Sequence, residues 1–231
     1  MVDIPSQNEV SDTGHPEALY VQYGCGLSAP PGWLNFDASP RLKLEQMPII
    51  RHALKRTFGT IFPENVLSGD IVAGLPVPDG ASAGVYCSHV LEHLPREDVP
   101  VALHNTAKML RPDGIFRLIV PDLRWRAEQY LQSATRAESG AADQFMDGCL
   151  LGKRAKLRGP PAILREYFGN SAHLWMYDFA CIKQLLLAAG FSTIRRCEFG
   201  DAKDAMFSYV ENRDRYIEND EFELAIEAAR S

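Results

Sequence analysis

Glycines and isolated polar residues follow the apolar, β-type segments of this sequence, where side chains can meet a ligand. The first such segment, residues 19–23, runs into Gly24, Cys25 and Gly26. Glycine permits a tight turn and lets the backbone approach a bound molecule closely. A Gly-x-Gly turn occurs in many folds, so its meaning depends on the residues that end the next segments.

Polar side chains also end the next three β-type segments. The second segment ends at Asp37, the third carries Asp70, and the fourth ends at Ser88 and His89. A carboxylate at the end of a second strand can accept two hydrogen bonds from a ribose diol. Because the carboxyl ends of parallel strands meet in one crevice, we expect these groups to surround one ligand.

Alternating β-type and helical patterns must position these residues, and they predict an α/β fold with a mostly parallel sheet covered by helices. The expected strands are residues 19–23, 33–37, 65–72, 84–88, 115–120, 191–199 and a half-exposed 221–227. The expected helices are residues 41–58, divided at Pro48, then 95–110, with Pro95 in its first turn, and 178–189, closed by Gly190.

The chain divides into a lead and one domain. Residues 1–17 are polar and predict a flexible N-terminal lead, and residues 18–231 form the domain. Within it, residues 123–172 lie between the fifth strand and the last helix and include helix-forming stretches. A connection of this length is more often functional than idle, so we interpret it as a helical lid or substrate insert. Its basic run, residues 153–158, would attract an anionic acceptor.

Composition narrows the class of protein. The chain has 231 residues, of which 46% are hydrophobic and 23% charged, as in a soluble globular domain. Its net charge of −6 argues against broad nucleic-acid binding. The five cysteines have no metal or disulfide spacing, no leader pattern is present, and no stretch approaches the ~18 apolar residues of a membrane span. We therefore expect a cytoplasmic protein without a membrane span.

Together, these segments make the chain resemble the class I S-adenosylmethionine-dependent methyltransferases, in particular a type 11-like bacterial subgroup. The likeness covers about residues 18–122 and 173–229. Its most specific part is Leu-Glu-His-Leu at 91–94, followed by Leu-Arg-Pro-Asp-Gly at 110–114. The matching segments, in chain order, are residues 23–26, 32–37, 69–71, 75–80, 88–94, 110–115, 120–122, 173–178 and 187–191.

The resemblance implies a Rossmann-like, seven-stranded sheet whose last strand is antiparallel, with helices on both faces. It implies S-adenosylmethionine as the cofactor and in-line methyl transfer, with O-methylation of a small molecule or glycan expected. An aromatic face, of Tyr23 or Tyr86, would suit the sulfonium. The implied cofactor residues are Tyr23, Gly24, Cys25 and Gly26 along the methionine part, Asp37 at the ribose, Asp70 and Ile71 at the adenine, and Ser88 and His89 beside the sulfonium.

Histidines near two of these segments suit catalysis. His89 and His173 are the candidate catalytic residues. His173 is the leading candidate for a general base, because histidine titrates near neutral pH. His89, Glu92 and His93 have the spacing of one helix face, and His173 could complete a metal site. We expect no metal, since Glu92 and His93 open this helix in similar enzymes that bind none.

The spacing after the glycine turn separates the methyltransferase from two alternative functions. Only ten residues lie between Gly26 and Asp37, too few for a full crossover helix. Without a helix dipole, the turn suits a methionine tail better than a pyrophosphate. A nicotinamide-dependent oxidoreductase is disfavoured, because Ala29 also takes the third glycine position. A non-catalytic cofactor-binding module is disfavoured because the turn and Asp37 are both present.

Overall fold

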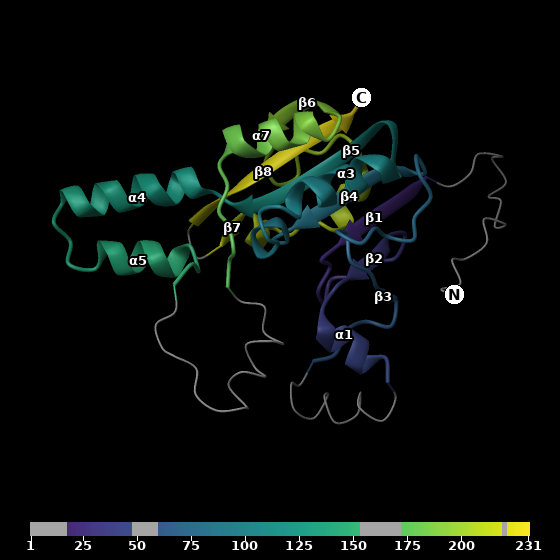
Figure 1. Ribbon diagram of the computed structural model, residues 1–231, viewed down its shortest axis with the longest axis horizontal. Helices are drawn as coiled ribbons and strands as arrows, with labels where there is room; N and C mark the ends of the chain where they lie inside the picture. The colour runs from purple at the N-terminus through teal and green to yellow at the C-terminus, as the bar shows by residue number, and fades with distance from the viewer. Residues whose placement is uncertain (1–17, 48–59, 153–171, 219–220) are drawn as a thin grey trace.

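A central sheet organises the computed structural model, which describes residues 18–47, 60–152, 172–218 and 221–231 (Figure 1). Three expectations fall outside the described residues: the N-terminal lead, the second half of the helix expected over 41–58, and the basic run 153–158. Within the described ranges, no helix has the length and apolar character needed to cross a bilayer.

The sheet has seven strands in the order β3-β2-β1-β4-β5-β8-β6, and the short β7 (Ile217–Glu218) pairs with β8 beside this path. Strands β1 to β5 pair in parallel, whereas β8 is antiparallel to β5 and to β6. The predicted seven-stranded, mostly parallel sheet with an antiparallel last strand is confirmed. The strand bounds are β1 Leu19–Tyr23, β2 Leu34–Asp37, β3 Val66–Ser68, β4 Ser82–Ser88, β5 Leu110–Pro121, β6 Phe191–Arg196 and β8 Glu221–Arg230.

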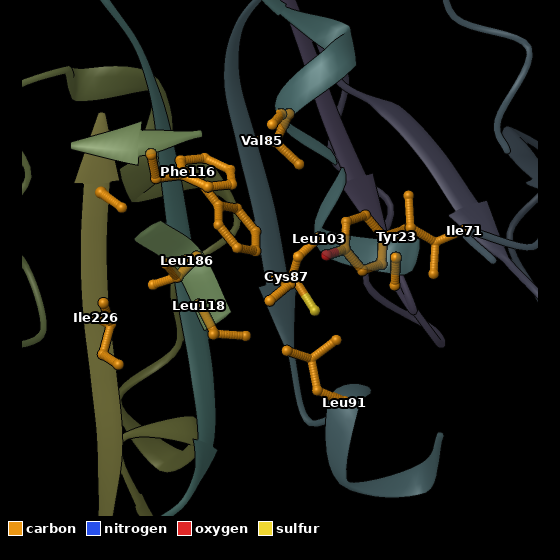
Figure 2. Close-up of a cluster of buried hydrophobic side chains, with 14 of the residues drawn as sticks. Tyr23, Ile71, Val85, Cys87, Leu91, Leu103, Phe116, Leu118, Leu186 and Ile226 are labelled. Carbon is orange, nitrogen blue, oxygen red and sulfur yellow. The ribbon is translucent and has the colours of Figure 1, made fainter. Parts of the chain in front are cut away.

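One face of the sheet packs against two α-helices, α3 (Val99–Met109) and α7 (Phe179–Ala188). Alternate residues of each strand point to this face, because side chains along a strand change sides at every residue. Figure 2 shows Phe116 and Leu118 of β5 beside Leu186 of α7, all nearly inaccessible to solvent. Each such side chain contributes about 1.5–3 kcal/mol when buried, so this core holds the strand ends in place.

The opposite face is covered by short 3-10 helices, η2 (Ala205–Tyr209) and η3 (Arg213–Arg215), and by the loops around them. Trp33 and Phe207 meet there edge to face, with ring centroids 5.6 Å apart. Helices were predicted on both faces. In the described part of the chain, the second face carries these single turns in place of long α-helices.

A buried arginine lies in the middle of this second face. Arg117 of β5 has no exposed surface, and its guanidinium contacts the carboxylates of Glu211 and Glu227 at 2.6 Å each. It also donates a hydrogen bond to the hydroxyl of Tyr216 at 3.2 Å. A buried charge is tolerated when it is paired and hydrogen-bonded, so these contacts tie β5 to β8 and to the segment that covers the sheet.

Two helices, α4 (Leu123–Thr135) and α5 (Ala141–Gly148), pack on each other and form an arm that extends from the sheet (Figure 1). Asp122 caps α4, because its carboxylate accepts hydrogen bonds from backbone N–H groups of the first turn. Arg126 is buried and pairs with Glu223 of β8 at 2.9 Å. Arg126 also pairs with Glu221 of β8, at 2.8 Å. The region expected to be a helical insert is therefore mostly helical where the structure describes it, and the ion pairs of Arg126 anchor it to the sheet.

Local signals placed some helix ends well and others poorly. Helix α7 is capped by Asp178, and Gly190 follows it with a φ of +93°, as predicted. Helix α3 begins at Val99 and not at Pro95, which lies in a turn before it. Helix α1 (Pro40–Glu45) ends before the proline that was expected to divide it.

Strand β8 is more buried than its sequence pattern suggested. Its alternating glutamates predicted one solvent-exposed face. Glu223 is only 9% exposed, and Ala225 on the same face is 4% exposed. The glutamates of this face pair with Arg126 and Arg117, so burial of both faces does not leave charges unpaired.

Candidate functional site

The glycine turn at the end of β1 requires glycine for two separate reasons. Gly24 and Gly26 have φ angles of +67° and +55°, in the left-handed region that other residues adopt at a cost. A Cβ atom on Gly24 would overlap the side chain of Val90, whereas one on Gly26 would meet nothing within 4 Å. The backbone N–H of Cys25 donates to the carbonyl of Phe36 at 3.1 Å, which fastens the turn to β2.

The carboxylate of Asp37 holds this turn. One oxygen accepts from the backbone N–H of Gly26 at 2.9 Å, and the other accepts from the N–H of Ser39 at 2.8 Å. Asp37 is 8% exposed. A carboxylate offers about four lone-pair positions, so acceptor capacity remains on both oxygens. Sequence reasoning placed Asp37 near the turn but missed this direct contact, which no sequence spacing encodes.

Strand β4 delivers Ser88 and His89 to the same edge. Tyr23 lies opposite Cys87 in the parallel register of β1 and β4, so Ser88 and His89 come next to the glycine turn. His89 has a φ of +53°, and its backbone N–H donates to the carbonyl of Ile119 at 2.9 Å. A non-glycine residue in this region is strained by about 1–3 kcal/mol, and such strain is concentrated at functional sites.

Asp70 and Ile71 follow the end of β3 and lie differently from each other. Asp70 is exposed, and one of its carboxylate oxygens accepts from the N–H of Val72 at 2.9 Å. Ile71 is 4% exposed and belongs to the core beside Tyr23 (Figure 2). Asp70 is thus presented for binding, while Ile71 is already packed against protein.

The two tyrosines expected near the sulfonium are core residues. Tyr23 is 2% exposed, and its hydroxyl shares a hydrogen bond with that of Thr106 at 3.1 Å. Tyr86 is 4% exposed and packs in the core of the opposite sheet face. Burial raises the pKa of both phenols. Neither ring offers a face to a cation, which corrects the expectation of an aromatic contact there. At position 23, only the backbone remains available for contact with a cofactor.

Next to His89, the fold brings together a carboxylate, Glu92, and two further histidines, His93 and His173. Glu92 lies in a single 3-10 turn, η1 (Leu91–His93), and is fully buried. Ligand atoms of Glu92, His93 and His173 all lie within 4.8 Å of one another. Nδ1 of His89 is 3.2 Å from Oε1 of Glu92. The spacing would place His89, Glu92 and His93 on one face if the segment were an α-helix. The chain instead forms a single 3-10 turn after the left-handed His89, and the residues still converge.

Burial and the Glu92 carboxylate act on the histidines differently. Burial lowers the pKa of His89, but contact with Glu92 and its charge outweigh burial, and the net pKa of His89 is raised. The pKa of His173 is lowered, mainly by burial and in addition by the charge of His93. His173 therefore favours the neutral form, in which one ring nitrogen keeps a lone pair.

A family of sequences described as "Methyltransferase domain" matches residues 28–195, which is more than half of the chain. The chain belongs to this methyltransferase family. The matched segment contains Asp37, Ser88 and His89 and begins just after Gly26, so the glycine turn is supported by the geometry above and not by the family match.

Solved structures with a similar fold include three methyltransferases. One is a putative methyltransferase in a complex with the Trm112 activator from Haloferax volcanii (14% identity, 93% of this chain and 83% of that chain, TM-score 0.46). The second is magnesium protoporphyrin IX methyltransferase from Synechocystis PCC 6803 with bound SAH (17% identity, 93% of this chain and 74% of that chain, TM-score 0.46). The third is a SAM-dependent methyltransferase from Archaeoglobus fulgidus (13% identity, 93% of this chain and 86% of that chain, TM-score 0.45). No curated protein matches the sequence.

A cavity of about 370 Å³ adjoins the histidine cluster of the methyltransferase. Pro121 at the end of β5 and Leu150 beyond α5 line it, together with His173. Arg126, Glu221 and Glu223, whose ion pairs anchor the arm, also line it. The cavity therefore lies between the arm and the carboxyl end of β5 and is partly polar.

Proposed function

We propose that the methyltransferase binds S-adenosylmethionine at the carboxyl edge of β1, β2 and β4. The hydrogen bond between Asp37 and Gly26 is the main support, because it joins the glycine turn and the ribose-binding acid into one unit at this edge. In this arrangement Gly24 to Gly26 lie along the methionine part and Asp37 accepts from the ribose. Exposed Asp70 accepts from the adenine amino group, and Ser88 borders the sulfonium.

The connection between β1 and β2 favours this cofactor over a dinucleotide. Residues 24–33 form turns and contain no helix. A dinucleotide fold places its pyrophosphate at the N-terminus of a helix, whose N–H groups and dipole bind the anion. That support is missing here, whereas a zwitterionic methionine tail does not depend on it. The nicotinamide-dependent oxidoreductase is therefore the weaker candidate.

We further propose that the acceptor is a small hydroxylated molecule or a glycan, methylated on oxygen. The charged side chains of Arg126 and Glu223 in the lining of the cavity beside His173 support a polar acceptor, and we propose the arm of α4 and α5 as its cover. His89 and His173, which both lie near the carboxylate of Glu92, are the proposed residues that act on the acceptor hydroxyl. Such an enzyme accelerates methyl transfer mainly by holding donor and acceptor at ~3–3.5 Å in line.

Calorimetric titration tests the cofactor site. We expect wild type to bind S-adenosylmethionine and not NADH, and Asp37→Ala to lose binding because the turn loses its acceptor. Asp79→Ala, which removes an exposed carboxylate paired with Lys108, is the matched control and keeps the wild-type affinity. Circular dichroism shows whether each variant is folded. An Asp37→Ala variant that is folded and binds with unchanged affinity would exclude the proposed site.

A further inference from the structure

A buried carboxylate without a hydrogen-bond donor lies at the centre of the histidine cluster. Glu92 is 0% exposed, and neither of its carboxylate oxygens has a hydrogen-bond partner among the described residues. Its closest polar contact is Nδ1 of His89, at 3.2 Å but without hydrogen-bond geometry. Burying an ionised carboxylate is costly, and buried charges are normally paired or coordinate a metal. Glu92 thus has unused ligand capacity.

The backbone orients two imidazoles toward this carboxylate. Nδ1 of His93 lies 3.0 Å from the carbonyl oxygen of Ala172, and Nδ1 of His173 lies 2.8 Å from that of Cys149. A carbonyl oxygen only accepts, so each Nδ1 carries the proton and each Nε2 of the neutral ring carries a lone pair. Metal-binding histidines are usually fixed in this way, by donating their other N–H to a carbonyl or carboxylate.

Backbone contacts bring the two halves of the cluster together. The N–H groups of Leu174 and Trp175 donate to the carbonyl of Glu92 at 2.7 and 3.2 Å, and the N–H of His173 donates to Leu150 at 3.2 Å. The segment before α7 is therefore fastened to η1 and to the end of the arm. The cluster is a built feature of the fold and not a chance meeting of surface side chains.

We propose that Glu92, His93 and His173 bind a divalent transition-metal ion of the zinc type. Two imidazole nitrogens and one carboxylate oxygen form the donor set of many catalytic zinc sites, in which a further position stays open. His89, whose Nδ1 lies 3.2 Å from Oε1 of Glu92, would orient the carboxylate. This inference rests on the proposed function for its location, because His173 also lines the proposed acceptor cavity and the open position would take an acceptor oxygen.

Metal binding is measured on the chelator-treated full chain, with Zn²⁺ alone in calorimetry and Co²⁺ as an absorption probe. We expect one ion per chain and a Co²⁺ spectrum of low coordination number. Glu92→Gln and His173→Asn should each weaken Zn²⁺ binding by at least about tenfold, since even an outer partner of a metal site is worth 10–100-fold. His104→Asn removes an exposed histidine of α3 and is the matched control with unchanged binding. Mg²⁺, which prefers oxygen ligands, should not compete.

The inference is overturned if folded wild type binds no Zn²⁺, or if Glu92→Gln and His173→Asn bind it as wild type does. If one variant fails to fold, the other variant and the Co²⁺ spectrum still decide. S-adenosylmethionine titration of the same metal-free samples separates the two proposals. If wild type binds S-adenosylmethionine but no Zn²⁺, the metal site alone is rejected. If wild type binds Zn²⁺ but no S-adenosylmethionine, the cofactor site alone is rejected.

Discussion

The substitution Gly24→Ala is expected to destabilise the protein more than the same substitution two residues later. Both glycines have a positive φ, so an alanine at either position costs about 1–2 kcal/mol of backbone strain. Only at Gly24 does the new Cβ atom overlap a neighbour, the side chain of Val90. Overpacking of this kind costs about 1–3 kcal/mol, because Val90 or the strand end must move. Gly24→Ala should therefore lose about 2–5 kcal/mol, and Gly26→Ala about 1–2 kcal/mol.

Urea unfolding of four proteins isolates the steric part: wild type, Gly24→Ala, Val90→Ala and the double variant. Because the overlap disappears when Val90 is shortened, the double variant should be more stable than the sum of the single losses predicts. We expect a coupling energy of about 1–3 kcal/mol, within the range found for residues in contact. Equal losses for Gly24→Ala and Gly26→Ala, or a coupling energy near zero, would refute the assigned contact between the turn and Val90.

Two further predictions concern buried groups. Arg117→Met leaves the carboxylates of Glu211 and Glu227 without their cation, so we expect a loss of about 3–5 kcal/mol in urea unfolding at pH 7, and a loss below ~1 kcal/mol would contradict the paired-charge role. Burial raises the pKa of the Cys25 thiol to about 12, so at pH 8 it stays protonated and unreactive, while partly exposed Cys181 is alkylated first by iodoacetamide. Mass spectrometry showing Cys25 modified as fast as Cys181 would rule this out.

Local sequence signals predicted the elements that short-range chemistry determines. The apolar run 19–23 became β1 with the same bounds, and Asp178 and Gly190 enclose α7 as expected. Sequence patterns gave the wrong burial where the outcome depends on a partner far away in the chain. The glutamates of β8 predicted an exposed face, but Arg117 and Arg126 pair with them after folding, across a long stretch of chain. Alternation of charge along one strand contains no information about such a partner.

The candidate site shows the same division. Gly24 and Asp37 were predicted to lie at one edge because both end parallel strands, and they do. The direct contact of Asp37 with the turn was not foreseeable, since it depends on backbone angles that glycine adopts only in the fold. His173 joins Glu92 because the segment before α7 bonds to η1. The spacing of His89, Glu92 and His93 would have brought them together on an α-helix, but the chain is left-handed at His89 and they meet without one.

The position of β8 in the sheet has a consequence for how the chain folds. Strand β5 pairs with β8 and not with β6, although α4, α5, α7 and β6 all intervene in sequence. The central contacts of this half of the sheet are therefore non-local, and topologies dominated by such contacts fold slowly. Until β8 arrives, one edge of β5 remains unpaired, with apolar residues such as Leu118 and Val120 beside it. That edge is where two partly folded chains would first associate, so refolding yield should fall with protein concentration.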